Sequence, residues 1–278
     1  MKYTARLPET NVNVTPTSPL KEFLILAGGL LGLAVGVYML LGLAVNLIVP
    51  RVPPEFEKRM TVFFPGSMRT SDLESERAAY VQGLVDDLKR RCVHLPYDFR
   101  IHVRDSATVN ALALPGGQIV VFSGLLDRVG SENELVFVLA HEMGHYAHRD
   151  HLKGLGRGLV LMVMSAFVFG SDSGVSQLLG RTLNLTELSF SRKQENRADA
   201  FGLGTLNCVY GHVAGATDFF EKIPESQDPG RFGHYFASHP ENRRRITRLQ
   251  NLTQKHGFGK GEREPLPKDL WKIRHPSG

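Results

Sequence analysis

The longest uninterrupted apolar stretch of the chain lies close to its beginning. No charged residue occurs from Phe23 to Val49, and a helix of about 27 residues is roughly 40 Å long, enough to cross a bilayer with some tilt. A cleaved signal peptide would have a shorter apolar region ending in an A-x-A-like site, which this run lacks. The pattern therefore predicts one transmembrane helix over residues 23–50, between a disordered tail over 1–22 and a linker over 51–70.

Glycine recurs at every fourth position within this run, at Gly28, Gly32 and Gly36. A tandem G-x-x-x-G spacing allows a second helix to approach closely, which is compatible with a homo-oligomer. The general abundance of glycine in spanning helices explains the spacing equally well. Three basic residues precede the run and four follow it before residue 70, so the positive-inside rule gives no orientation.

After the predicted transmembrane helix, the spacing of the apolar positions indicates a domain that contains both helices and strands. Helical periodicity and capping residues predict four helices, over residues 71–92, 131–151, 187–206 and 237–252. A strand is expected over about 98–103, and two more strands are expected on either side of Pro115-Gly116-Gly117, a hairpin signal. The fold class is therefore expected to be α+β, mainly helical with a small sheet over about 98–123. This domain is assigned to residues 71–255 and a tail to 256–278.

A second uncharged stretch covers residues 158–171. It is short for a spanning helix, which favours a core helix or a helix at the membrane interface. The sequence does not decide whether the region 158–180 is a lid, an interfacial helix or core. It links the predicted helices over 131–151 and 187–206. We expect the active cleft to lie between the edge of the small sheet and the first of these helices, and we expect the region 158–180 to flank that cleft.

Composition excludes several classes of protein. With 42% hydrophobic and 22% charged residues, the chain is neither collagen-like, coiled coil nor wholly disordered. A net charge of +5 without a nucleic-acid motif gives no support for nucleic-acid binding. The two cysteines, Cys92 and Cys208, exclude a disulfide-rich scaffold and a cysteine-built zinc site. They are most simply two thiols, although a single bridge between them is left open.

The candidate chemistry begins with His141-Glu142-Met143-Gly144-His145, an H-E-x-x-H pattern on a predicted helix. Residues four apart share one face of a helix, so both imidazoles can meet one ion. Imidazole is a common zinc ligand, and the adjacent Glu142 is placed to act as a general base toward a water molecule.

A hydrolytic zinc site needs a third ligand and an open position. No further histidine follows at the spacing that would supply it, but Glu195 lies on the next predicted helix, with Asp199 four residues later on the same face. A carboxylate at Asp199 can accept a hydrogen bond from the distal nitrogen of a ligand histidine and fix its orientation.

The motifs HEMGH and ENRADAF in this order resemble the gluzincin peptidase family that includes HtpX, BepA and the CAAX prenyl endopeptidases. Two further segments of the chain match motifs of that family: Asn110-Ala111 with Pro115-Gly116-Gly117, and Ser238-His239-Pro240 with Arg245-Ile246. The resemblance covers about residues 73–252. It implies that His141, His145 and Glu195 bind one zinc ion per chain and that Glu142 is the catalytic base.

The same resemblance assigns supporting roles to other residues. Asp199 would lie behind the ligands, and Asn110 and Ala111 would lie near the substrate backbone on an edge strand. His239 would stabilise the oxyanion of the tetrahedral intermediate, with Arg245 supporting it. Without the resemblance, the run of three arginines that ends at Arg245 would indicate an exposed basic helix face.

With one clear span, the chain departs from the many-spanning members, so neither an intramembrane chamber nor prenylated substrates are implied. It is more similar to single-anchor or soluble members associated with protein quality control.

We expect a membrane-anchored zinc metalloendopeptidase that hydrolyses protein or peptide substrates by metal-activated water. We also expect a single-pass protein of the bacterial inner membrane, and the resemblance favours an extracytoplasmic domain. The alternative is a non-catalytic, chaperone-like binder, which the retention of Glu142 and all three ligands disfavours.

Overall fold

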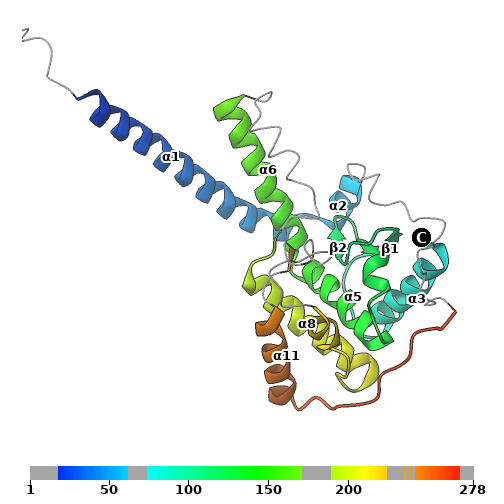
Figure 1. Ribbon diagram of the computed structural model, residues 1–278. Helices are drawn as coiled ribbons and strands as arrows, with labels where there is room; N and C mark the ends of the chain where they lie inside the picture. Colours follow the sequence, from blue (N-terminus) through cyan, green and yellow to red (C-terminus); the bar gives the residue numbers. More distant parts are fainter. Residues whose placement is uncertain are drawn as a thin grey trace, which may run out of the picture.

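The computed structural model describes residues 18–61, 74–170, 189–223, 235, 238–239 and 242–269. Two long helices, α1 (Pro19–Ile48) and α6 (Asp150–Phe169), extend away from the same end of a body that holds the other elements (Figure 1). Most of the expected N-terminal tail and the last residues of the expected C-terminal tail lie outside the described residues.

The other helices are short to medium in length. They are η1 (Val49–Arg51), α2 (Pro54–Met60), α3 (Ser75–Arg91), α4 (Ser123–Leu126), α5 (Glu132–Ala147), α8 (Arg192–Tyr210), α9 (Asp218–Glu221) and α11 (Asn242–His256). The helix α5 lies at the centre of the body, and its residues from Asn133 to Tyr146 are all buried. The mainly helical α+β class expected from the sequence is confirmed.

The sheet in the described part of the chain has three strands in the order β1-β3-β2. Strand β1 (Arg100–Arg104) pairs in parallel with β3 (Gln118–Phe122), and β2 (Ala111–Leu114) pairs with β3 as the expected hairpin. Both glycines of the turn adopt φ near +80°, which explains why glycine is needed there. Among the residues that the structure describes, β2 therefore has one unpaired edge.

Helices α5 and α8 approach closely because small residues meet at their contact. A Cβ atom on Gly144 would lie 2.9 Å from the Cα atom of Ala198, closer than packed atoms allow. At its start, α5 is capped by Ser131, whose hydroxyl accepts a hydrogen bond from the Glu134 backbone N–H at 3.2 Å. The cap fixes where the helix begins and hence which face carries the motif histidines.

The expected helix over 131–151 ends early, at Ala147, and the chain turns sharply before α6. Arg149 has φ of 54°, a left-handed conformation that arginine rarely adopts. Its guanidinium donates hydrogen bonds to the carbonyl oxygens of Val49 and Val52, just after α1. This contact with a segment about 100 residues away compensates the strained turn, and no local pattern could predict it.

Part of the segment expected as a linker is the helix α2, which is attached to the body by a buried glutamate. The carboxylate of Glu57 lies 2.8 Å from Tyr97 Oη, 3.1 Å from His151 Nε2 and 3.3 Å from Arg149 Nη1. Burial alone would raise the pKa of Glu57, but the hydrogen bond and charge of His151 and the hydrogen bonds from Tyr97 and the Gly116 backbone lower it. The turn of the hairpin also packs on α2, at Gly116.

The apolar run over 158–171 does not form a core helix. As far as Phe169 it belongs to α6, where Val163 and Phe167 are 63% and 91% exposed. The remainder of the expected region, residues 171–180, lies outside the described residues. The base of α6 packs against α1, with Gly156 directly facing Val45. By length and composition, α1 and α6 are both apolar enough to cross a membrane.

The two cysteines form a disulfide, so the simpler interpretation as two thiols is wrong. The bond joins Cys92, at the end of α3, to Cys208 in α8, with Cα atoms 6.0 Å apart and a sequence separation of 116. The pairing depends on how two distant helices pack, which spacing in the sequence does not determine.

We expect the disulfide to stabilise the body. Closing a loop of this size typically contributes about 2–4 kcal/mol, mainly by restricting the unfolded chain. The double variant Cys92→Ala/Cys208→Ala should unfold several degrees below the wild type, at about 2–4 °C per kcal/mol. Thermal unfolding of the full chain in detergent, with and without reductant, measures this. A wild-type midpoint that reductant does not lower would contradict the prediction.

Candidate active site

Four side chains that are far apart in the sequence converge beside the centre of α5. His141 and His145 come from α5, Glu195 from α8, and His239 from the segment before α11. All four are buried, and one ligand atom from each lies within 4.8 Å of the others. The three ligands expected from the sequence are thus brought together, and His239 joins them.

The facing atoms of His141, His145 and Glu195 are better placed to bind one shared metal ion than to form hydrogen bonds with one another. His145 Nε2 lies 3.4 Å from Glu195 Oε1 and makes no hydrogen bond within the described residues. His141 Nε2 lies 3.5 Å from Glu195 Oε2. Buried polar atoms without partners are costly, and two imidazoles with one carboxylate are a ligand set that zinc accepts.

The other nitrogen of each motif histidine faces a buried carboxylate. His141 Nδ1 lies 3.1 Å from Asp199 Oδ1, as expected from the sequence, and His145 Nδ1 lies 3.5 Å from Asp150 Oδ2. Such carboxylates fix the ring orientation of a ligand histidine and increase its basicity. Asp150 was missed by the sequence analysis, because it reaches His145 only through the left-handed turn at Arg149.

Burial and neighbouring charges shift the pKa values of the two motif histidines in opposite directions. Burial, followed by the charge of Arg245, lowers the pKa of His141 to about 3. Burial also disfavours the charged form of His145, but its contacts with Asp150 and Glu195 outweigh this and raise its pKa to about 9. The side of the cluster near His145 therefore favours a positive charge, as a cation site requires.

Glu142 lies beside the cluster and is almost fully buried. Its Oε2 has no hydrogen-bond partner within the described residues, and its Oε1 lies 3.6 Å from His239 Nε2. Burial raises the pKa of Glu142, because the charged carboxylate loses hydration. A carboxyl group with a raised pKa is suited to both accepting and releasing a proton near neutral pH.

Arg245 holds the two carboxylates of α8. Its Nη1 lies 2.9 Å from Glu195 Oε2, and its Nη2 lies 2.6 Å from Asp199 Oδ1. The guanidinium is fully buried and lies over the ring of Phe220 at 4.4 Å. Although burial favours protonated Glu195, the charges of His239 and Arg245 hold the pKa of this carboxyl well below its usual range. An exposed basic face is therefore wrong for Arg245, although Arg243 and Arg244 are exposed.

His239 contacts both the ligand carboxylate and the general-base candidate. Its Nδ1 lies 3.0 Å from Glu195 Oε1, while its Nε2 faces Glu142. The ring also stacks on Tyr235, with centroids 5.1 Å apart. This position fits the expected role near the oxyanion, and it also brings a histidine nitrogen within reach of a metal ion.

The edge strand β2 lies next to Glu142, beside the cluster of His141, His145, Glu195 and His239. Asn110 is buried, with Nδ2 3.4 Å from Ser238 Oγ and Oδ1 accepting from the Ala111 N–H at 3.0 Å. It therefore ties the strand to the His239 segment. Residues Ala111 and Ala113 line a narrow cleft together with Glu142, which places the cleft between the sheet edge and α5.

Phe190 also lines this cleft and was not anticipated from the sequence. Its ring stacks on the imidazole of His145, with centroids 3.8 Å apart and planes inclined by 15°. The backbone N–H of Phe190 donates to the Ser238 carbonyl oxygen at 3.1 Å. The aromatic ring therefore covers one side of the cluster.

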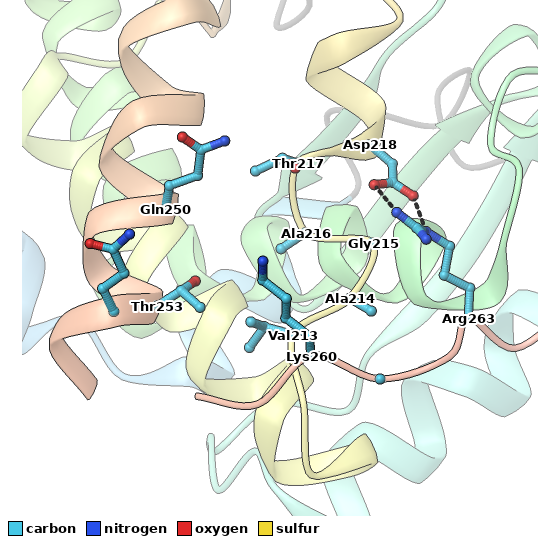
Figure 2. A pocket seen from close by; sticks show the side chains of 12 residues that line it. Val213, Ala214, Gly215, Ala216, Thr217, Asp218, Gln250, Thr253, Lys260 and Arg263 are labelled. Carbon is cyan, nitrogen blue, oxygen red and sulfur yellow. Dashed lines mark hydrogen bonds and ion pairs between the residues drawn. The ribbon is translucent and has the colours of Figure 1, made fainter. Parts of the chain in front are cut away.

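A larger pocket, of about 460 Å³, lies elsewhere in the body. It is formed by the loop from Val213 to Asp218, by α11 and by the segment from Lys260 to Arg263 (Figure 2). An ion pair between Arg263 Nε and Asp218 Oδ2, 2.5 Å apart, borders it. It shares no residue with the histidine cluster, and its lining offers no comparable set of metal ligands.

Comparison with known proteins agrees with this geometry. Residues 75–253 match the family model described as peptidase family M48. The chain is 31% identical to the mitochondrial metalloendopeptidase OMA1 of Arabidopsis thaliana, over 53% of this chain and 30% of that protein. It is 29% identical to the metalloprotease LoiP of Escherichia coli, over 66% of this chain and 73% of that protein.

A second Escherichia coli protein, the metalloprotease YcaL, is 28% identical over 56% of this chain and 62% of its own length. The chain spans less than half of the OMA1 proteins of Arabidopsis thaliana and Schizosaccharomyces pombe. The family match covers more than half of the chain and includes every residue of the histidine cluster. The chain therefore belongs to peptidase family M48.

Proposed function

We propose that the protein is a membrane-anchored zinc endopeptidase that hydrolyses peptide bonds in protein substrates. The observation that carries this proposal is the convergence of His141, His145 and Glu195 on one point, with Glu142 lining the adjacent cleft. The relatives named as metalloendopeptidases and metalloproteases support the same activity.

One zinc ion per chain would be held by His141, His145 and Glu195. Bound there, it would supply Lewis acidity, which activates a water molecule and polarises a substrate carbonyl. The unpartnered Nε2 of His145 and the oriented Nδ1 atoms of both histidines support this assignment. The buried Arg245 keeps Glu195 ionised and in place, as a ligand carboxylate must be.

The other steps of peptide hydrolysis would use backbone and side-chain groups of the protein itself. An extended substrate can add to the unpaired edge of β2 at Ala111, where main-chain hydrogen bonds would align the scissile bond with the cleft. Glu142 accepts a proton from the attacking water and then donates it to the leaving amine. Nε2 of His239 lies on the same side, at 3.6 Å from Glu142, and can donate a hydrogen bond to the oxyanion.

The disulfide supports an extracytoplasmic location for the catalytic body. Disulfides persist in oxidising compartments and are rare in the cytosol, and Cys92 and Cys208 are paired in the folded body. With α1 as anchor, this agrees with a bacterial inner-membrane protein whose domain lies outside the cytoplasm. The family resemblance supports a role in quality control of membrane or envelope proteins.

A non-catalytic, chaperone-like binder would use the same edge strand without the chemistry. Such a protein has no need for a buried general base, and burying Glu142 without a hydrogen-bond partner for Oε2 is costly. The enzyme is therefore the better-supported function.

The role of Glu142 can be separated from metal binding. We expect Glu142→Gln to bind zinc normally and to lose at least about 100-fold in casein cleavage, because general acid–base catalysis contributes about that much or more. Glu195→Ala should lose both zinc and activity. Zinc content and casein cleavage of the detergent-purified full chain measure both effects, and Glu76→Gln, at an exposed glutamate, is the matched control. Full turnover by Glu142→Gln, or a zinc-free wild type, would contradict the proposal.

Arg245 should act through the two carboxylates that it holds. Breaking a buried charge pair typically costs about 3–5 kcal/mol, and lysine cannot reproduce the paired contacts of a guanidinium. We therefore expect Arg245→Lys to lower both the thermal midpoint and the zinc affinity. Arg244→Lys, at an exposed position of the same helix, should change neither. Zinc affinity from competition with a chromogenic chelator distinguishes the two variants, and equal affinities would refute this role.

A further inference from the structure

The outer part of α6 presents an apolar surface that the described part of the chain does not cover. Leu159, Val163 and Phe167 are 44%, 63% and 91% exposed. No charged residue occurs in the sequence between Arg157 and Asp172. An exposed, contiguous apolar face of this kind marks a contact with a membrane or with another protein.

The base of α6 is joined to the end of the membrane anchor. Gly156 packs on Val45, and Arg157 Nη2 lies 3.2 Å from the side-chain oxygen of Asn46. Both helices then extend away from the body on the same side (Figure 1). Because α1 has no buried residue and is apolar enough to cross a membrane, the apolar surface of α6 is continuous with the surface of the proposed anchor.

The length of the apolar part of α6 fits partial insertion into a bilayer. The twelve uncharged residues of α6 after Arg157 form about 18 Å of helix, roughly half of a hydrocarbon core. Arg157 and Asn46 form a polar pair where the two helices meet, and long basic side chains commonly extend to the headgroup level. Polar groups at the base and apolar groups beyond it match the order of a bilayer surface.

We infer that α6 dips into the same bilayer as α1 and that lipid acyl chains cover its apolar face. This places the cleft at the membrane surface, because Leu155, which lines the cleft, is two residues from Arg157, about 3 Å along the helix. The first residue of α6, Asp150, also lies behind the ligand His145. One helix thus forms part of both the membrane contact and the active site.

This position selects a class of substrate, and that part of the inference rests on the proposed peptidase function. The edge of β2 would receive extended segments that run close to the lipid headgroups. The preferred substrates would be juxtamembrane stretches of membrane proteins, or unfolded chains attached to the bilayer. Freely soluble peptides would be cleaved without this advantage.

Fluorescence quenching tests the insertion without using catalysis. In a Trp271→Phe background, which removes the single tryptophan, Phe167→Trp is compared with Tyr38→Trp in α1 and with Phe258→Trp in the body. Each full chain is placed in vesicles of phosphatidylcholine and phosphatidylglycerol, with or without dibrominated acyl chains. We expect brominated lipid to quench Phe167→Trp and Tyr38→Trp strongly and Phe258→Trp weakly.

Two results would overturn the insertion. Quenching of Phe167→Trp by aqueous acrylamide but not by brominated lipid would place the face in water. A fluorophore protected from both quenchers would mean that protein covers the face, for example a second copy of the chain. Neither result would affect the proposed peptidase activity, which is measured separately on casein.

The substrate class is tested with one peptide sequence in two forms, free in solution and tethered to a lipid in the same vesicles. We expect Val163→Asp/Phe167→Asp to cleave the free peptide at the wild-type rate and to lose the preference for the tethered form. The control is Asn251→Asp/Gln254→Asp, which adds the same charge at exposed positions of α11. A preference that survives in the α6 variant would refute the substrate assignment. A wild type that cleaves neither form would count against the peptidase instead.

Discussion

The close contact between α5 and α8 at Gly144 and Ala198 sets how near the two motif histidines lie to Glu195. These histidines project from α5 and Glu195 projects from α8, so the separation of the two helix axes would set the size of the proposed metal site. A larger side chain at Gly144 would meet the backbone of Ala198 and would push Glu195 away from the imidazoles. Packing density at one residue therefore determines whether three ligands can share one ion.

The site also requires nearby positive charge, because it buries several carboxylates in one place. Without compensation, a buried carboxylate would take up a proton rather than remain a ligand. Arg245 and the histidines prevent this at Glu195 and Asp199. At Glu142 the compensation is weaker, so burial dominates and the pKa rises. The same buried environment thus yields two stable anions, Glu195 and Asp199, whose pKa the histidines and Arg245 hold low, and one carboxyl group, Glu142, whose raised pKa lets it exchange protons.

Local periodicity predicted most of the fold and placed His141 and His145 on one helix face, and the family resemblance added Glu195 to the expected ligands. Contacts between distant segments did not follow from the sequence. The H-E-x-x-H spacing and the hairpin glycines act within a few residues, so their geometry follows from helix and turn rules. Asp150 reaches His145 only because Arg149 adopts a left-handed turn. Phe190 was missed for a similar reason, since nothing in its neighbourhood indicates that it stacks on a ligand imidazole. The pairing of the cysteines, 116 residues apart, likewise depends on the packing of two helices.

The buried contacts of Glu57 with Tyr97 and His151 have a mechanical consequence. They attach the segment after the anchor directly to the body, and Arg149 bonds to the same segment. These contacts tie the end of α1 to the body through buried side chains rather than through a flexible tether. Encounters with targets in a membrane would then depend on lateral diffusion of the anchor and the body together, in two dimensions.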